Sequence, residues 1–288
     1  MTFTNVAQLA DAQTERSKYL SFRKLPAVVT GAGTWYDYSM APGNPPPQYY
    51  AAAPLTAQTM ARSTDGGIQH GGNVSPLSKY LRKLTLMSVA AAGVPQRVYM
   101  LDYLMFYPFV DMGTPDQQDM INVQTLPRYA TGAGVQMMAI LVAPHGLVGD
   151  TFFVTYTNQD GTAGRVTPLH TMSTAIAVNG TILTTQQTGA RRFGPFLALQ
   201  AGDTGVRSIE AVQCTAGTDV GLFTLVLVQP LAEMTVREVT APTEADFYLT
   251  SGGKLPAIVD DAYLNFISCP NGSLTGVPLF GDATFIWN

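Results

Sequence analysis

The alternation of apolar and polar residues indicates strands over the middle of the chain. From residue 84 onward, short apolar runs are separated by residues that favour turns. Asp-Gly at 160–161 and Asn-Gly at 179–180 are typical of tight hairpins. The pattern therefore predicts strands at 84–91, 97–106, 135–143, 151–157, 163–167, 181–186, 195–200, 205–214 and 220–229.

These closely spaced runs predict an all-β fold. No helical period of ten or more residues separates them, which argues against alternating strands and helices. Their number and spacing favour a jelly-roll-like β-sandwich. One helical pattern occurs at residues 5–22, with Thr4 as the expected N-cap. We expect three parts: an N-terminal helix and extended arm (1–83), a β-sandwich core (84–240) and a C-terminal extension (241–288).

The predicted arm is irregular but rich in aromatic residues. Between residues 26 and 78, Pro and Gly are too frequent for a helix or a central strand. The aromatic side chains must nevertheless be buried, either on the chain's own body or on a partner. We expect residues 25–78 to become ordered only in an assembly. The predicted partner-binding residues of the arm and the C-terminal tail are Trp35, Tyr36, Tyr38, Tyr49, Tyr50, Phe285 and Trp287.

Charge is sparse and unevenly distributed. Charged residues make up 12% of the chain, about half of the usual fraction of ~25%. Residues 1–97 carry a net charge of +5 and residues 98–288 carry −9. A basic front half predicts contact with something acidic, which is either the body of a neighbouring copy or nucleic acid.

Other features argue against nucleic acid and membranes as partners. The chain has only five lysines, and its adjacent basic residues are limited to Arg82-Lys83, Arg191-Arg192 and Arg23-Lys24, whereas nucleic-acid-binding proteins usually carry a dense basic stripe. Apolar stretches are far shorter than the ~20 residues of a membrane span. Charged residues within the first thirty positions also argue against a signal peptide.

No motif for nucleotide binding or nucleophilic catalysis is present. GAG at 31–33 follows a strand-like segment, but Tyr36 occupies the position of the third glycine that a dinucleotide site requires. Neither GxxxxGK[ST] nor GxSxG occurs. We therefore expect no cofactor and no catalytic residue.

The titratable residues also lack the spacing of a metal site. His70, His145 and His170 are far apart in the chain and are expected to be solvated or hydrogen-bonded in loops. The acidic segment 111–119 lacks the spacing of a calcium loop and is expected to form a turn, as are Asp260 and Asp261.

Cys214 and Cys269 are expected to be free thiols, and two cysteines alone make no structural zinc site.

Four stretches resemble a group of virion structural proteins of tailed bacteriophages. They are VYMLDYLMFYPFVDM (98–112), LPRYATGAGVQ (126–136), GPFLALQAGDTGVRSIEAVQ (194–213) and LFTLVLVQPLAEM (222–234). The resemblance covers about residues 80–240 and contains no catalytic residue. It implies a capsid cement or decoration protein on the virion surface, made in the host cytoplasm, whose partners are the major capsid protein and copies of itself. Jelly rolls occur among such proteins, in agreement with the strand pattern.

Two alternatives stay open. The first is another virion component, such as a tail, neck or fibre-anchoring protein. The second is a carbohydrate-binding or carbohydrate-active β-sandwich, whose hydrolytic form needs two carboxylates across a cleft. Asp102 and Glu210 are candidates for that pair, although the strand alternation does not place them together.

Overall fold

The computed structural model describes residues 3–184, 194–250, 252 and 254–288. It confirms the all-β sandwich class, because antiparallel sheets make up nearly all of its regular structure. A central sheet has the strand order β2-β16-β6-β13-β8, with β4 also paired to β6. A lower sheet has the order β14-β5-β17-β1-β3, with β15 also paired to β5. An upper sheet has the order β10-β9-β12-β7, with β11 also paired to β9.

The elements have the following bounds. The helical elements are α1 (Val6–Glu15), η1 (Tyr38–Met40), α2 (Arg62–Asp65), η2 (Ala91–Gly93) and α3 (Phe247–Thr250). The strands are β1 (Ser17–Lys24), β2 (Tyr36–Asp37), β3 (Gly43–Asn44), β4 (Gln58–Thr59), β5 (Lys79–Ser88), β6 (Gln96–Asp111), β7 (Gln118–Asp119), β8 (Gln136–Ala143), β9 (Thr151–Asn158), β10 (Arg165–Val166), β11 (His170–Thr171), β12 (Val206–Cys214), β13 (Leu222–Val236), β14 (Thr243–Asp246), β15 (Ala257–Ile258), β16 (Tyr263–Cys269) and β17 (Leu279–Trp287).

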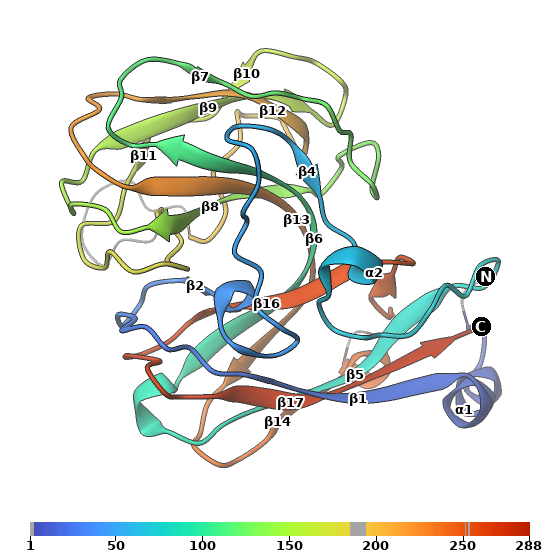
Figure 1. Ribbon diagram of the computed structural model, residues 1–288. Helices are drawn as coiled ribbons and strands as arrows, with labels where there is room; N and C mark the ends of the chain where they lie inside the picture. The colour runs from blue at the N-terminus through green and yellow to red at the C-terminus, as the bar shows by residue number, and fades with distance from the viewer. Residues whose placement is uncertain (1–2, 185–193, 251, 253) are drawn as a thin grey trace.

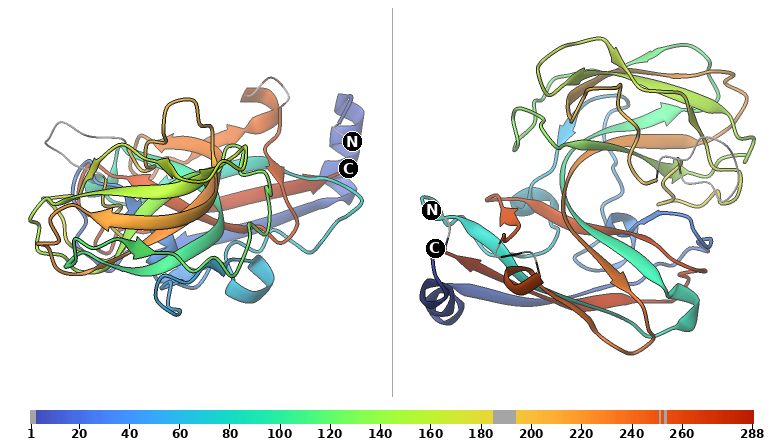
Figure 2. Two further views of the ribbon diagram at one scale, coloured as in Figure 1. Left: turned by 90° about the horizontal axis from the view of Figure 1, so that it is seen from above. Right: turned by 180° about the vertical axis from the view of Figure 1, so that it is seen from behind.

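Two long strands connect the two halves of the molecule. β6 and β13 pair with each other from Leu222↔Asp111 to Val236↔Gln96, with register shifts along the way. Figure 1 shows both strands running from the upper half into the lower half, and Figure 2 shows the same arrangement from behind. The central sheet therefore belongs to both halves.

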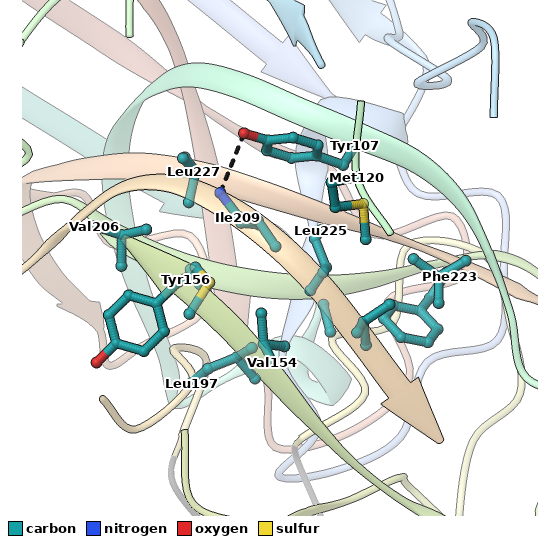
Figure 3. Packing of buried hydrophobic residues seen from close by; sticks show 14 of the residues in the cluster. Tyr107, Met120, Val154, Tyr156, Leu197, Val206, Ile209, Phe223, Leu225 and Leu227 are labelled. Atoms are coloured by element: carbon teal, nitrogen blue, oxygen red, sulfur yellow. Dashed lines mark hydrogen bonds between the residues drawn. The ribbon is translucent and has the colours of Figure 1, made fainter. Parts of the chain in front are cut away.

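The upper core lies between the upper sheet and one end of the central sheet. Phe152, Val154 and Tyr156 of β9 face Phe223 and Leu225 of β13 in one buried cluster. Figure 3 shows Val154, Tyr156, Phe223 and Leu225 in this cluster. It also shows the backbone N–H of Ile209 in β12 donating to the Tyr107 hydroxyl of β6 at 3.2 Å. Period-two alternation in β9, where every second residue is buried, produces this one-sided core.

The lower core lies between the lower sheet and the other end of the central sheet. Leu84 and Leu86 of β5 and Phe285 of β17 pack with Leu264 and Phe266 of β16. β17 lies between β5 and β1, and its Gly281 lies so close to Thr85 that a Cβ built there would be 1.8 Å from the Thr85 carbonyl oxygen. The C-terminal segment is thus an interior strand of the lower sheet.

Several expected elements differ from the observed ones. The helix ends at Glu15 and its cap is Asn5, whose side chain accepts from the Gln8 backbone N–H at 2.9 Å. Residues 17–24 form β1 instead, where pairing with β17 places Phe22 in the lower core. No strand forms at 195–200, and 181–184 makes only isolated bridges, while 185 and 186 lie outside the described residues.

Parts 1–83 and 241–288 both contribute strands to the lower sheet, through β1 and β5 on one side and β14 and β17 on the other. These two parts therefore share one sheet and one core. The division of the chain into three parts stays a prediction.

Candidate interaction surfaces

The arm packs on the chain's own body. Trp35, Met40, Tyr50 and Met60 are buried in a third cluster against side chains of the central sheet. Tyr36, Tyr38 and Phe285 belong to the lower core. The sequence left open whether these aromatic side chains are buried on the chain's own body or on a partner. In the structure, these residues are buried on the chain's own body.

A buried carboxylate fastens the arm to the central sheet. Asp37 accepts hydrogen bonds from the Ser39 backbone N–H at 2.9 Å, from the Tyr50 hydroxyl at 2.7 Å and from the Tyr103 hydroxyl of β6 at 2.6 Å. Burial raises the pKa of Asp37, and these donors oppose the rise. The Lys24 side chain is also buried, donates to the Pro45 carbonyl oxygen at 2.8 Å, and has a pKa lowered to about 8 by burial. These polar contacts fix the path of the arm.

The remaining predicted contact residues keep some exposed surface. Tyr49 is 57% exposed, and Trp287 is half-buried at the end of β17. Their contact with a partner stays a prediction. The side chains of the other five are used in packing within this chain.

The charge asymmetry is neutralised within the chain to a large extent. Five ion pairs join basic residues of the front half to acidic residues of the body. They are Arg62–Asp261, Lys79–Asp260, Arg82–Asp246, Lys83–Glu244 and Arg97–Glu233. The basic front therefore lies against an acidic surface, as predicted, but that surface belongs to the same chain. Arg191 and Arg192 lie outside the described residues.

All three histidines are buried. His70 and His145 are hydrogen-bonded in loops, as expected, whereas His170 lies in strand β11. His70 Nδ1 lies 3.1 Å from Lys79 Nζ, and its Nε2 lies 2.9 Å from the Ala262 carbonyl oxygen. Burial lowers the pKa of both His70 and His170 to about 4. No group of three or more His, Cys, Asp or Glu side chains with the geometry of a metal site occurs among the described residues.

The two carboxylates considered for glycoside hydrolysis have separate structural roles. Asp102 of β6 forms a buried bidentate ion pair with Arg128, at 2.9 and 2.7 Å. Glu210 of β12, in the upper sheet, accepts from the Thr157 hydroxyl at 2.6 Å and from the Gly164 backbone N–H. Neither pairs with the other across a cleft.

The expected turns and thiols are observed. Asp111 accepts from the Gly113 backbone N–H at 2.8 Å, which confirms a turn in the acidic segment. Asp260 and Asp261 also lie in a turn, and they hold the arm by accepting from the backbone N–H groups of Val74 and Ser63. Both cysteines are free.

One loop tip of the upper half presents apolar side chains to solvent. Val148 is 56% and Val220 is 62% exposed, and both lie next to Gly146, where a built Cβ would be 3.7 and 3.6 Å from their Cγ2 atoms. Leu147, which is also exposed, adopts a left-handed backbone conformation with φ of 59°. That conformation is strained for leucine and persists only where the surroundings impose it.

Asp219 imposes the loop-tip conformation. Its fully buried carboxylate accepts from the backbone N–H groups of Gly146, Val148 and Val220, and it lies 3.2 Å from His145 Nδ1. Burial alone would raise the pKa of Asp219, but these donors bring it below its usual value. The exposed valines are therefore held on a rigid support, a property of preorganised binding surfaces. The sequence showed no signal for this surface, because its two loops are about 70 residues apart.

A second surface is a groove along β13. Two adjoining cavities of about 600 and 650 Å³ share Glu233 and follow β13 from Gln229 to its end. The opposite wall consists of β14 and of residues 254–257.

Comparison with known proteins gives little similarity. No family model and no curated protein matches this chain. Among solved structures, the VP2 subviral particle of infectious bursal disease virus aligns at 10% identity over 96% of this chain and 83% of that chain, with a TM-score of 0.18. The Gt strain of the same virus aligns at 10% identity over 95% and 82%, also with a TM-score of 0.18. Scores this low carry no argument about fold or function. No helix among the described residues is long and apolar enough to cross a membrane.

Proposed function

We propose that this protein is a structural component of a bacteriophage virion, a cement or decoration protein that binds and stabilises the major capsid lattice without catalysing a reaction. The observation that carries the proposal is the rigid apolar loop tip formed by Leu147, Val148 and Val220. These adjacent apolar side chains are exposed, and Leu147 has a left-handed backbone conformation. Contiguous exposed apolar surface marks protein contacts, and strained residues cluster at functional sites.

The location of the resembling segments agrees with a role in architecture. Residues 98–112 and 222–234 form most of β6 and β13, which connect the two halves, and 206–213 form most of β12. The resemblance to phage virion proteins therefore concerns the strands that define the whole shape, and it supports a shared scaffold. None of the four resembling stretches contains a loop-tip residue, so the tip is an observation separate from those motifs.

The capsid contact is tested by removing apolar surface from the tip. We expect the double substitution Val148→Asp and Val220→Asp to abolish binding of the full chain to capsids that lack it, measured by co-sedimentation. Both residues are exposed, so circular dichroism and the thermal midpoint should change little. The matched control is the double substitution Val123→Asp and Val166→Asp, which places the same two charges at exposed valines outside the tip. Equal binding by both variants would contradict the assignment of the tip.

Copy number separates the capsid from the other virion locations. Mass spectrometry of purified particles should find hundreds of copies per particle for a protein that covers the capsid, whereas a tail or neck protein would be present in a handful. We also expect heat-treated particles to release DNA at a lower temperature when this protein is removed. Particles without any copy would refute the virion assignment itself.

A further inference from the structure

The lower half of β13 has one unpaired edge. β8 pairs with β13 only from Leu222 to Val228, whereas β13 continues to Val236 beside β6. Figure 1 shows this continuation into the lower half of the molecule. No hydrogen bond from another described residue reaches the backbone of Leu231–Val236 on the side that β8 leaves. At about 3.3 Å per residue, positions 229–236 form an edge about 26 Å long.

The sequence of this segment is typical of an edge strand. Pro230 lies just past the last residue paired with β8, and a register shift follows it. Proline cannot donate to a ladder and is confined to edges and bulges. The outer edge of β8, by contrast, is covered, since the N–H groups of Leu183 and Leu197 donate to Ala139 and Met137. Edge strands with unpaired backbone groups are templates for pairing with another chain.

The groove beside this edge has room and side chains for an added strand. Its floor includes Phe247, which is buried, and Leu255, which is half-buried. The hydroxyl of Tyr129 and Oε1 of Gln229, at one end of the groove, are buried and have no hydrogen-bond partner among the described residues. Buried polar atoms are rarely left unpaired, so these two atoms point to a missing partner.

We propose that the groove along β13 binds an extended segment of a different polypeptide chain, which pairs with the free edge of Leu231–Val236 as an added strand. Main-chain hydrogen bonds supply the affinity in this recognition mode, and alternate side chains enter the groove. The segment should carry apolar residues at every second position, because one of its faces meets Phe247 and Leu255 while the other meets solvent near Glu233 and Lys254.

A second copy of this chain is a poor donor. Its described ends are already engaged: β17 lies between β5 and β1, and α1 packs Leu9 and Ala12 against Tyr80 and Ile286. Donating either end would dismantle the lower sheet. The inference rests on the proposed function only for the source of the segment, which would be a neighbouring virion protein.

The test uses a displayed library of nine-residue peptides selected on the full chain. We expect enriched peptides to have apolar residues at alternate positions. Their affinity for the Ala257→Arg and Ala241→Arg variants should be at least tenfold lower than for the wild type, because each arginine fills one end of the groove. The matched control, Ala163→Arg, adds the same side chain at an exposed alanine of the upper half and should bind as the wild type does.

Backbone recognition is then tested on the best binder. Methylating three alternate amide nitrogens on the edge that faces β13 should weaken binding at least about tenfold, because each lost hydrogen bond contributes several-fold. Methylating the alternate three on the other edge should have little effect. If both methylated peptides bind as tightly as the unmethylated one, the peptide is held by its side chains without strand pairing, and the proposal is overturned.

The outcomes separate this inference from the proposed function. If no selected peptide is sensitive to the groove variants while the protein still binds capsids, the groove proposal fails and the virion role stands. If groove-dependent peptides are found but particles contain no copy of the protein, the virion role fails and the groove proposal stands. Concentration-dependent self-association that Ala257→Arg abolishes would overturn the choice of a different chain as the donor.

Discussion

The hydrogen bonds that Asp37 accepts from Ser39, Tyr50 and Tyr103 attach the arm to the central sheet. Removing one of them tests whether the arm is an independent tail or part of the fold. Tyr50 is fully buried, holds a left-handed backbone conformation with φ of 55°, and donates to Asp37 at 2.7 Å. Its ring also contacts Phe106 of β6, with ring centroids 5.3 Å apart. Tyr50→Phe keeps the ring and removes only the hydroxyl, which isolates the contribution of the polar contact.

The expected cost follows from the environment of the hydroxyl. Removing one donor from a buried acceptor costs about 1 to 3 kcal/mol, with the upper end for an ionised carboxylate. The free energy of unfolding decreases by about 3 kcal/mol per molar urea for a protein of this kind. The urea concentration at the unfolding midpoint of the Tyr50→Phe variant should therefore fall by roughly 0.3 to 1 M. Tyr49→Phe is the matched control, because Tyr49 is the neighbouring residue and 57% exposed, so its effect should stay within about 0.5 kcal/mol.

The assay is urea unfolding of the isolated chain, followed by tryptophan fluorescence, together with limited proteolysis. Trp35 lies in the same cluster as Tyr50 and reports on release of the arm. Because the arm packs within a single chain, we expect the isolated wild-type chain to resist cleavage within residues 36–60, contrary to the assembly-dependent order predicted from the sequence. The Tyr50→Phe variant should be cleaved there faster. Equal midpoints for both variants would refute the role of the centre. Rapid cleavage of the wild-type arm would instead support order that depends on assembly.

Four further predictions concern the interior of the protein. Arg128→Met should destabilise the fold by about 3 to 5 kcal/mol in thermal or urea unfolding at neutral pH, because it leaves Asp102 as an unpaired buried charge. Burial raises the pKa of Asp102 to about 6, so its contribution to the free energy of unfolding should decrease as pH rises from about 4 to 6. Asp102→Asn should remove that part of the pH dependence, and an unchanged slope would contradict the assignment. Gly281→Ala should unfold the lower sheet or cost several kcal/mol, whereas Gly72→Ala, with nothing within 4 Å of a built Cβ, should be neutral; equal thermal midpoints would argue against β17 as an interior strand. Cys214 should resist thiol reagents in the native protein, because burial excludes the reagent and raises the thiol pKa to about 12, and stoichiometric labelling would show that the upper core opens.

Local features of the core were predictable from the order of the amino acids. Period-two alternation and Asp-Gly or Asn-Gly turns identified β8, β9, β12 and most of β6 and β13, because side-chain direction in a strand depends only on neighbouring positions. Gly161 and Gly180 both have positive φ, as the turn signals required. The need to bury the arm's aromatic residues was also evident from composition, since many large rings cannot remain solvated.

The partners of those rings and charges depend on contacts between segments that are far apart in the chain. Residues 17–22 have a helical local pattern but belong to β1, whose partners in β17 are more than 250 positions away and leave no trace in that pattern. The positive front half is neutralised by acids of the same chain, and a sum of charges cannot distinguish this from a contact between copies. The loop tip around Asp219 and the free edge of β13 depend on which strands end beside which, and such contacts between distant segments leave no periodic trace in the sequence.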